Sequence, residues 1–539
     1  MESSPVAAPP IPLHEQPSIH ARRWFLLAIM CLSLVLVVMS VSGLNTALPT
    51  MQRDLGASAS ELQWIVDAYA VVFAGLLLTA GAIGDRFGRR GALLAGLGVF
   101  GVGAFMGGLA TNAGQVIASR AVMGIGAAFI MPATLSIITA IFPPHERARA
   151  IAIWAGFAGA GASIGPIVTG GLLEGFWWGS TLLVNVPIVI AIVAAVWAFA
   201  PASRDDTRTR LDPTGALLSL VGLSSLIFGI IQGPEDGWTS GTVLAAFLVA
   251  NVTLTLFVLW ERRSDHPMLP LTLFGDRRFS TGSGVITIAF FVMFGFFFLM
   301  TQYFQFGRGY SPLEAGLAGL PLALTFVVFS PRSAAMAERY GAARVMALGL
   351  AIVAAGFVVL STLSTDTPYL VVGGAFALLG AGMSITVAPA TGEIMTSVPL
   401  SKAGVGSAVN DTTRELGGAL GIALMGSIAN SAYRSNIDLD GVRLPAGTRA
   451  VAEDSIGAAD AVAGRIPGGD ALTAQAASAF TDAFTLVNSV SVGIAVAAAA
   501  AVLYVGRRRR HEPALEDIQG DAAELGLELA PVPVGRARD

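Results

Sequence analysis

The sequence predicts an all-α polytopic membrane protein with fourteen transmembrane helices. Apolar residues make up 54% of the 539 residues and charged residues only 13%, and the mean hydropathy is +0.70. Apolar runs long enough to cross roughly 30 Å of hydrocarbon recur along the chain. Arginines gather in alternate loops, as they do where those loops face the cytoplasm. A soluble protein could not bury so much apolar surface, so the bilayer must be the solvent.

The individual spans follow from the apolar runs, each read at 1.5 Å per residue. The first run starts at Trp24 after Arg22 and Arg23, and it is too long for a signal-peptide core, so we expect a retained helix. The fourteen spans are expected near 24–44, 63–82, 91–110, 116–138, 150–172, 181–200, 213–231, 242–260, 281–303, 314–331, 345–362, 369–390, 404–428 and 486–505.

The arginine distribution predicts that both termini lie in the cytoplasm. The opposite side keeps Arg53, Arg308 and a few arginines of the loop 431–480. We expect a disordered cytoplasmic tail at 1–21 and a second cytoplasmic tail at 506–539. The cytoplasmic side then receives Arg86, Arg89, Arg90, Arg147, Arg149, Arg204, Arg208, Arg210, Arg262, Arg263, Arg277, Arg278, Arg332, Arg339, Arg344 and Arg507 to Arg510.

An internal repeat predicts two related halves. The tetrapeptide at 85–88, after the second span, recurs in similar form at 338–341, after the tenth span. A Gly-x-Gly pair followed by Pro-Ala-Thr also recurs, from the fourth span to the twelfth. Both offsets are about 255 residues, or eight spans. Two six-helix halves at 22–200 and 281–505, separated by linkers and two inserted helices within 201–280, account for this offset.

Some residue types limit the chemistry. Cys31, the only cysteine, falls in the first span, which excludes a disulfide framework and a thiolate metal site. The histidines all fall in tails or loops, so a buried proton site must use carboxylates. We expect no metal, no cofactor and no nucleic-acid partner. The polar loop 431–480 is expected outside the membrane, with room for short helices and no assigned chemistry.

The segment from Gly81 to Arg90 joins the second and third spans. Its glycines permit a tight cytoplasmic turn, and its charges stay at the membrane surface. An ordinary positive-inside loop is the alternative interpretation. The segment resembles the signature loop of the major facilitator superfamily, in which the aspartate forms a charge-relay and helix-dipole latch. This resemblance implies a conformational switch, with Asp85 and Arg86 central, formed by Gly81, Gly84, Asp85, Arg86, Gly88, Arg89 and Arg90.

The fourth span carries Arg120, followed by Gly124 and Gly126, and it resembles the second motif of that superfamily. A guanidinium inside the bilayer is costly and prefers a partner in the protein interior. A structural ion pair with Asp67 is the alternative to a functional role.

The fifth span resembles the motif that marks antiporters in the superfamily. Small residues at four-residue spacing let helices approach closely, and a proline allows a bend. Thr169 takes the place of one glycine of the family pattern, and generic helix packing is the alternative interpretation. The residues of this antiporter-type helix are Gly161, Gly165, Pro166 and Gly170.

A closer resemblance covers nearly the whole chain. The segment 62–69 is similar to the start of the second span in quaternary-ammonium and multidrug exporters of the fourteen-span drug:proton antiporter branch. The segments 45–49, 184–187, 401–404 and 480–484 fit that branch as well. The resemblance implies the major-facilitator fold. Ser40 stands where many relatives carry a membrane aspartate, so the role of that aspartate cannot be transferred.

The thirteenth span holds three charged residues on one helical face. Asp411 lies three residues before Arg414 and four before Glu415, two to four turns from the cytoplasmic loop. This spacing predicts a protonatable site for proton and substrate coupling, to which Arg120 and Arg414 contribute, with Asp67 as a further carboxylate. A static buried network is the alternative.

These features favour proton-coupled efflux of lipophilic, often cationic, drugs by alternating access. The proton gradient is the expected energy source, and small substrates, protons and membrane lipid are the expected partners of a functional monomer. The expected location is the bacterial inner membrane. One alternative is a dedicated exporter of a single antibiotic, lipid or siderophore. The other is an integral-membrane enzyme or sensor, for which the sequence offers no catalytic cluster.

Overall fold

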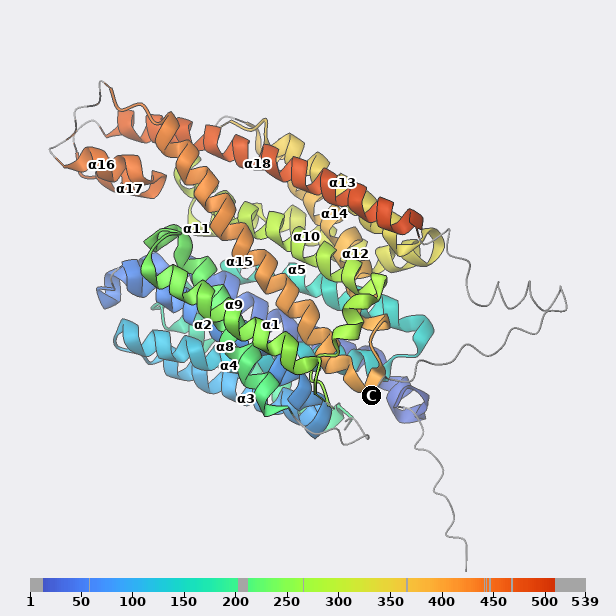
Figure 1. Cartoon of the computed structure of the whole chain (residues 1–539). Helices are drawn as coiled ribbons and strands as arrows, with labels where there is room; N and C mark the ends of the chain where they lie inside the picture. Colours follow the sequence, from blue (N-terminus) through green and yellow to red (C-terminus); the bar gives the residue numbers. More distant parts are fainter. Residues whose placement is uncertain are drawn as a thin grey trace, which may run out of the picture.

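The computed structural model describes residues 13–508 except 58, 202–211, 265, 365–366, 441, 443, 445–446 and 467–468. Throughout this described part the regular elements are helices, without a strand. Long helices lie side by side, with the first half of the chain on one side and the last half on the other (Figure 1). The predicted all-α class is confirmed. The expected linker 201–212 and the C-terminal tail lie largely outside the described residues.

The first half of the chain packs largely on itself, with close pairs α3–α4, α1–α5 and α2–α4. Its helices are α1 (Pro17–Leu55), α2 (Ala59–Phe87), α3 (Arg89–Gly108), α4 (Ala113–Ile141), α5 (Pro144–Gly175), α6 (Ser180–Leu183) and α7 (Asn185–Phe199).

Helix α1 starts earlier than expected. Residues 17–21, assigned to a disordered tail, are helical, so that boundary was wrong. Pro17 suits the first helical turn, where its missing N–H is no loss. Arg23 then fastens this end of α1 to α5, since its Nε and Nη2 donate to the Glu146 carboxylate at 2.6 and 3.0 Å.

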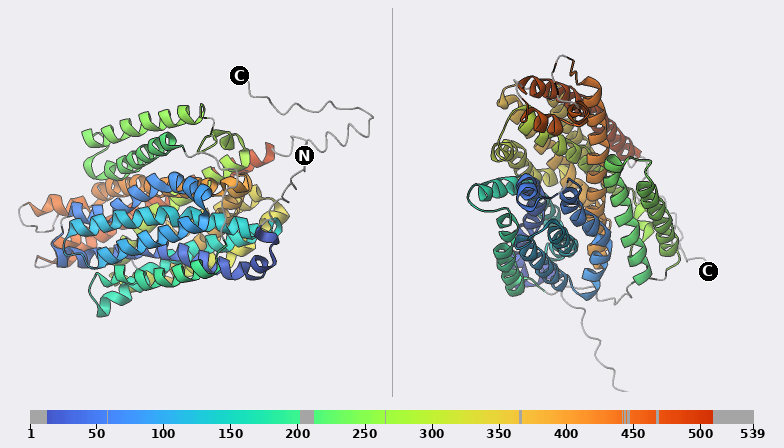
Figure 2. Two further views of the ribbon diagram at one scale, coloured as in Figure 1. Left: turned by 90° about the horizontal axis from the view of Figure 1, so that it is seen from below. Right: turned by 90° about the vertical axis from the view of Figure 1, so that its left-hand side faces the viewer.

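Two helices, α8 (Pro213–Asp236) and α9 (Gly241–Glu261), form a pair on one flank of the bundle (Figure 2). Helix α8 packs against α2 and α15, so the pair contacts both halves. Asp212 caps α8 by accepting from the Gly215 amide at 2.8 Å, and Ser240 caps α9 by accepting from the Val243 amide at 3.3 Å. These caps satisfy amides that the first helical turn leaves unpaired.

The last part of the chain forms a second group, in which α10–α15, α13–α14 and α12–α14 are close pairs. The short helices α16 and α17 lie in the expected extramembrane loop. The elements are η2 (Leu271–Gly275), α10 (Arg277–Gln302), η3 (Tyr303–Gly307), α11 (Pro312–Ala318), α12 (Leu320–Tyr340), α13 (Ala342–Leu360), α14 (Tyr369–Thr396), η4 (Leu400–Lys402), α15 (Ala403–Asn436), α16 (Thr448–Asp454), α17 (Ile456–Ala463) and α18 (Asp470–Arg508).

Among the described residues, thirteen helices are long and apolar enough to cross a membrane. Helix α15, the expected thirteenth span, is not among them, although it has 34 residues. It packs against α10 and α18 of its own half and against α2 and α4 of the first half. A polar helix is tolerated at membrane depth where protein rather than lipid surrounds it.

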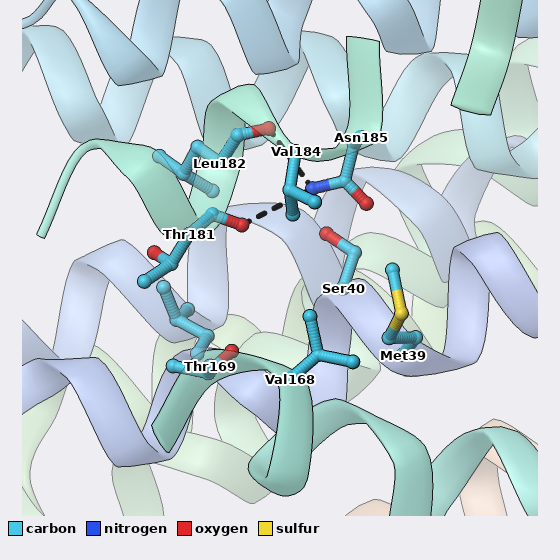
Figure 3. A pocket seen from close by; sticks show the side chains of 9 residues that line it. Met39, Ser40, Val168, Thr169, Thr181, Leu182, Val184 and Asn185 are labelled. Carbon is cyan, nitrogen blue, oxygen red and sulfur yellow. Dashed lines mark hydrogen bonds between the residues drawn. The ribbon is translucent and has the colours of Figure 1, made fainter. Parts of the chain in front are cut away.

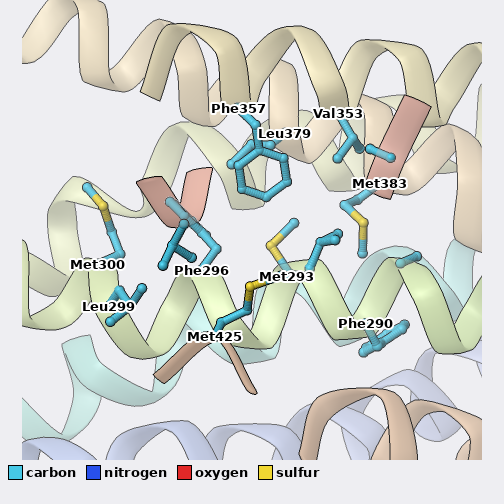
Figure 4. Packing of buried hydrophobic residues seen from close by; sticks show 14 of the residues in the cluster. Phe290, Met293, Phe296, Leu299, Met300, Val353, Phe357, Leu379, Met383 and Met425 are labelled. Carbon is cyan, nitrogen blue, oxygen red and sulfur yellow. The ribbon is translucent and has the colours of Figure 1, made fainter. Parts of the chain in front are cut away.

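Each half has its own apolar core. In the second half, Phe296 of α10 packs edge-on against Phe357 of α13, with 5.8 Å between ring centroids (Figure 4). Phe296 is only 2% exposed and Phe290 9%, whereas Phe298 is 44% exposed. The rings of the Phe-rich α10 therefore differ in their surroundings, and Phe290 and Phe296 pack inside the protein.

Candidate functional site

The junction between α2 and α3 joins the two halves through Asp85. The segment 81–90, expected as a loop, is helical except at Gly88, and Asp85 lies in the last turn of α2. This carboxylate is buried, and its Oδ1 accepts from Nε of Arg89 at 2.9 Å. Its Oδ2 accepts from the amides of Gly404 and Val405, at 2.8 and 3.2 Å. These amides belong to the first turn of α15, where a helix has unpaired N–H groups and partial positive charge. Asp85 thus caps α15 across the interface between the halves.

Close backbone contact accompanies this cap. A Cβ on Gly81 would lie 2.5 Å from the carbonyl oxygen of Gly404, so only glycine permits this approach. The chain turns from α2 into α3 at Gly88, whose φ of 116° disfavours any residue with a side chain. At the repeated position in the second half, Gly341 has a φ of 86° between α12 and α13.

The other charges at this junction, on the end of α2 and the start of α3, have different partners. Arg89 is only 3% exposed, and its Nη2 also donates to the Leu400 carbonyl at 2.5 Å. Arg86 lies over the ring of Phe87 at 5.2 Å, and Arg90 donates to the Trp197 carbonyl at the end of α7. The ion-pair partner of Asp85 is therefore Arg89.

The inserted helix pair meets the same region. Nζ of Lys402, next to the first turn of α15, donates to the carbonyl of Pro267 at 3.0 Å. Glu261 at the end of α9 is 4% exposed, and its Oε2 accepts from the Leu269 amide at 3.2 Å. The carboxylate also interacts electrostatically with Lys402. The linker between α9 and α10 is thus fastened to both α9 and the start of α15, which the sequence did not reveal.

Arg120 lies in the interior of the first half, fully buried. Its guanidinium stacks on the ring of Tyr69 at 4.4 Å, and its Nε donates to the Ile65 carbonyl at 3.1 Å. Among the described residues it forms no ion pair with Asp67. Asp67 instead lies near Glu235 of the inserted pair, a like charge with which it interacts electrostatically. The suggested pairing of Arg120 with Asp67 was therefore wrong.

Asp411, Arg414 and Glu415 lie together on α15. Asp411 is 1% exposed, and its Oδ1 lies 3.7 Å from Nη1 of Arg414. The same oxygen accepts from Nδ2 of Asn410 at 3.2 Å, while Oδ2 has no partner. Glu415 interacts electrostatically with Arg414 and with Tyr69 of α2. The structure thus groups these residues on α15, with Glu415 toward α2 of the first half and Arg414 toward α10 of the second, and leaves Asp67 apart from them.

Phe290 of α10 completes this group. Its ring lies 4.6 Å from the guanidinium carbon of Arg414 and 5.7 Å from the ring of Phe294. The sequence shows Phe290 as one of many rings in the ninth span, but no pattern in the chain links it to Arg414. The contact depends on how α10 and α15 pack.

The antiporter-type segment of α5 packs against α1 and α11. A Cβ on Gly165 would collide with Ser42 Oγ and would lie 2.6 Å from the Met39 carbonyl oxygen of α1. Gly161 faces Val38 of α1, at a looser 3.0 Å. Pro166 and Gly170 lie toward α11, Pro166 against Gly316 and Gly170 against Leu313. Close helix packing is the contact that the structure shows for this segment.

Ser40 lines a small pocket between α1, α5 and the α6–α7 junction (Figure 3). Its hydroxyl and the side-chain oxygen of Asn185 are buried without a protein partner. Asn185 donates instead to the carbonyls of Thr181 and Leu182. None of the pocket's lining residues is ionisable. In the described part of the chain, no group of three or more His, Cys, Asp or Glu residues is arranged so that it could bind a metal ion.

The Major Facilitator Superfamily sequence model matches residues 30–422. The multidrug efflux pump LfrA of Mycolicibacterium smegmatis is 36% identical over 491 residues, 90% of this chain and 97% of LfrA. The methyl viologen resistance protein SmvA of Salmonella typhimurium is 32% identical, over 83% of this chain and 90% of SmvA. The tetracenomycin C resistance and export protein of Streptomyces glaucescens is 29% identical, over 95% of this chain and 99% of that protein.

Solved structures are similar in fold. A bacterial homolog of the human lysosomal transporter Spinster, in an inward-facing and unoccupied conformation, aligns with 93% of this chain and 100% of its own. The TM-score is 0.60 at 17% identity. The human organic anion transporter MFSD10 aligns with a TM-score of 0.57 at 14% identity, over 89% of this chain and 100% of its own. At such identities the likeness concerns the fold alone.

Proposed function

Because this chain belongs to the major facilitator superfamily, we propose that it exports lipophilic, often cationic, drugs in exchange for protons across the bacterial inner membrane. Its relatives include a multidrug efflux pump and a protein named for resistance to methyl viologen, a cation. Both termini face the cytoplasm in this proposal, and a monomer suffices. Membership of a transporter superfamily disfavours the alternative of a membrane enzyme or sensor.

The observation that carries the proposal is the pair of carboxylates on α15, of which Asp411 is buried and Glu415 is partly buried. This helix contacts both halves, so the protonation state of Asp411 and Glu415 can influence how the halves pack. Asp411 keeps one oxygen without a protein partner, available to a proton or a cation. Two acids four residues apart can hold two protons as coupled sites. Asp67 lies on the α8 side of α2 and would affect cationic substrates only secondarily.

Alternating access is the proposed mechanism, and the contacts between the halves support it. The halves at 22–200 and 281–505 would rock about their interface, with Asp85 holding its own end of the bundle closed. Protonation of the α15 carboxylates would favour one arrangement, and cation binding the other. A ligand shifts such an equilibrium only by its difference in affinity for the two states.

Efflux from proteoliposomes tests this proposal, with the pH gradient and the membrane potential imposed separately. A monocation leaving for one proton moves no net charge, so it follows the pH gradient at about 1.4 kcal/mol per unit. A second proton adds one charge, worth about 2.3 kcal/mol per 100 mV. Asp411→Asn should abolish active cation export, while Glu415→Gln should weaken the dependence on potential and retain some pH-driven export.

One result would contradict the assignment. If the Asp411→Asn, Glu415→Gln double mutant still concentrates cations against a gradient, both residues are structural and coupling occurs elsewhere. Asp440→Asn serves as the control, because Asp440 is an exposed acid of the extramembrane loop.

A dedicated exporter of one antibiotic is the second candidate function, since a relative that aligns with nearly the whole chain is named for tetracenomycin C export. Efflux assays with a panel of lipophilic cations and neutral antibiotics separate the two. Broad transport supports the multidrug function, and transport of one compound supports the dedicated one.

A further inference from the structure

Arg414 is held more loosely than Arg120, a fully buried arginine of the first half. Its closest carboxylate oxygen, on Asp411, is 3.7 Å away, which is an ion-pair distance but too long for a hydrogen bond. Its other described contact is the ring of Phe290. Arg120, in contrast, donates to a backbone carbonyl and is fully buried, whereas the Arg414 side chain is 12% exposed. Arg414 can therefore be displaced at lower cost.

The surroundings of Arg414 have the chemistry that binds a lipophilic cation. An aromatic face attracts cations, most strongly where water is excluded. Phe290 offers such a face, and Phe294 lies beside it. Along α10, Phe290 lies apart from Phe296, whose ring packs against Phe357 of α13 (Figure 4). Asp411 supplies the negative charge, with Oδ2 unpartnered and the residue 1% exposed. The guanidinium now occupies the position where these features converge.

A second acid offers Arg414 an alternative partner. Glu415 follows it directly in the chain and already interacts with it electrostatically. Placing two cations beside one buried carboxylate costs electrostatic free energy, because the cations repel each other in a medium of low dielectric constant. An incoming cation would thus take Asp411 and Phe290, while Arg414 would turn toward Glu415 and remain paired.

We propose that Phe290 and Asp411 form the binding site for the charged centre of a lipophilic monocation, and that Arg414 occupies this site as a resident cation until the substrate displaces it. The inference rests on the proposed export of cationic compounds. Besides occupying the empty site, Arg414 would release the substrate, because its return to Phe290 would expel the bound cation after the halves have rearranged.

Equilibrium binding of tetraphenylphosphonium to the purified full chain tests the proposal. Arg414→Gln should bind this cation about five- to tenfold more tightly than the wild type, since no cation–π contact or ion pair has to be displaced. Efflux of the same cation should slow, because nothing expels it. Adding Phe290→Leu to Arg414→Gln should remove the gain in affinity.

Two comparisons separate this effect from a general disturbance. Triphenylphosphine oxide, a neutral analogue, should bind the wild type and Arg414→Gln equally well. Arg414→Lys retains the charge and is the variant to use if the neutral one does not fold. It should bind the cation about two- to threefold more tightly, because an ammonium lacks the planar face that stacks on Phe290.

The possible failures are distinguishable. If the wild type binds and exports the cation, but neither folded Arg414 variant binds it more tightly, Arg414 is a structural or direct binding group and the inference is wrong. If the wild type binds no lipophilic cation and exports only neutral compounds, both the proposed substrate class and this site are wrong. A difference between the wild type and Arg414→Gln in affinity for the neutral analogue would also contradict a charge-based competition.

Discussion

Asp85 is a single carboxylate that connects residues more than 300 positions apart. Its two oxygens have different donors: Oδ1 accepts a hydrogen bond from Arg89, and Oδ2 accepts hydrogen bonds from two amides of α15. All of these bonds are charge-assisted, and such bonds are roughly twice as strong as neutral ones. The backbone contact at Gly81 brings the helices close enough for the bonds to form. One residue can therefore hold one arrangement of the two halves.

Asp85→Asn should slow or abolish transport while substrate binding persists. The amide keeps one acceptor oxygen but lacks the charge that attracts Arg89 and the positive end of α15. The closed arrangement would then lose stability, and the cycle would stall. Efflux rates and equilibrium binding, measured on the same preparation, check this. A mutant that binds and transports like the wild type would return this segment to an ordinary positive-inside loop.

The residue scale also shows what one sequence can and cannot predict. Asp411, Arg414 and Glu415 could be grouped because they share a face of one helix. The suggested pairing of Asp67 with Arg120 took no account of the direction in which Asp67 leaves its helix. Ile65 and Tyr69 are one turn apart and both contact Arg120. Asp67, two residues from each, points about 200° away at 100° per residue, and so faces α8.

At the scale of elements, small residues decide how closely α1 and α5 approach. Gly165 lies against the backbone of α1, whereas a methyl group added at Gly171 of the same helix would have no neighbouring atom within 4 Å. The four-residue spacing of small residues predicted that α5 has a close partner. It could not predict that this partner is α1, because the pattern contains no information about the other helix.

Gly165→Ala should destabilise the protein, and Gly171→Ala should not. The added methyl at 165 would overlap Ser42 Oγ and the Met39 carbonyl, and overpacking of this kind costs about 1–3 kcal/mol. At 171 the methyl meets nothing, and alanine favours a helix slightly more than glycine does. Melting temperatures in detergent compare the two. Equal melting temperatures would show that α1 and α5 are not tightly packed at this point.

The inserted helices are fastened to the end of the bundle where Asp85 caps α15. Lys402 bonds to the linker between α9 and α10, while Arg89 bonds to Leu400 two residues earlier. The segment η4 therefore lies between the first half and the inserted pair. Met268 and Leu269 of the linker are buried in the core of the second half. Movement of α15 must involve this linker, which a simple lipid-facing insertion would not require.

Lys402→Met should loosen that linker. The neutral side chain cannot donate to Pro267 or interact with Glu261, so the linker should open more often. Trypsin should then cleave after the exposed Arg262 and Arg263 several-fold faster than in the wild type, with fragment masses identifying the site. Arg332→Met, an exposed arginine of α12, is the control. Unchanged cleavage rates in Lys402→Met would mean that buried Met268 and Leu269 hold the linker without help.

At the scale of the whole molecule, the apolar runs predicted the positions of the long helices well. All fourteen expected spans coincide with helices, and most helices extend beyond the apolar run that indicated them. Hydropathy finds the part that lies in hydrocarbon, but helices continue where backbone bonds and caps still support them. Helix α15 is too polar to be recognised as a span from its hydropathy. It can carry charges inside the bundle because both halves surround it, a property that depends on the assembled bundle.

The topology of the chain tests whether α15 crosses the membrane. Reporter fusions after Arg90 and Arg210 follow two and six spans, so both should report the same side as the N-terminus, the cytoplasm. A fusion after Asp440 follows α15 as the thirteenth span and should report the outside. A fusion after Arg510, in the part of the chain that lies beyond the described residues, follows α18 and should report the cytoplasm again. If α15 did not cross, the Asp440 fusion would report the cytoplasm and the Arg510 fusion the outside. Because the two readouts must change together, a reversed pair would refute the fourteen-span topology.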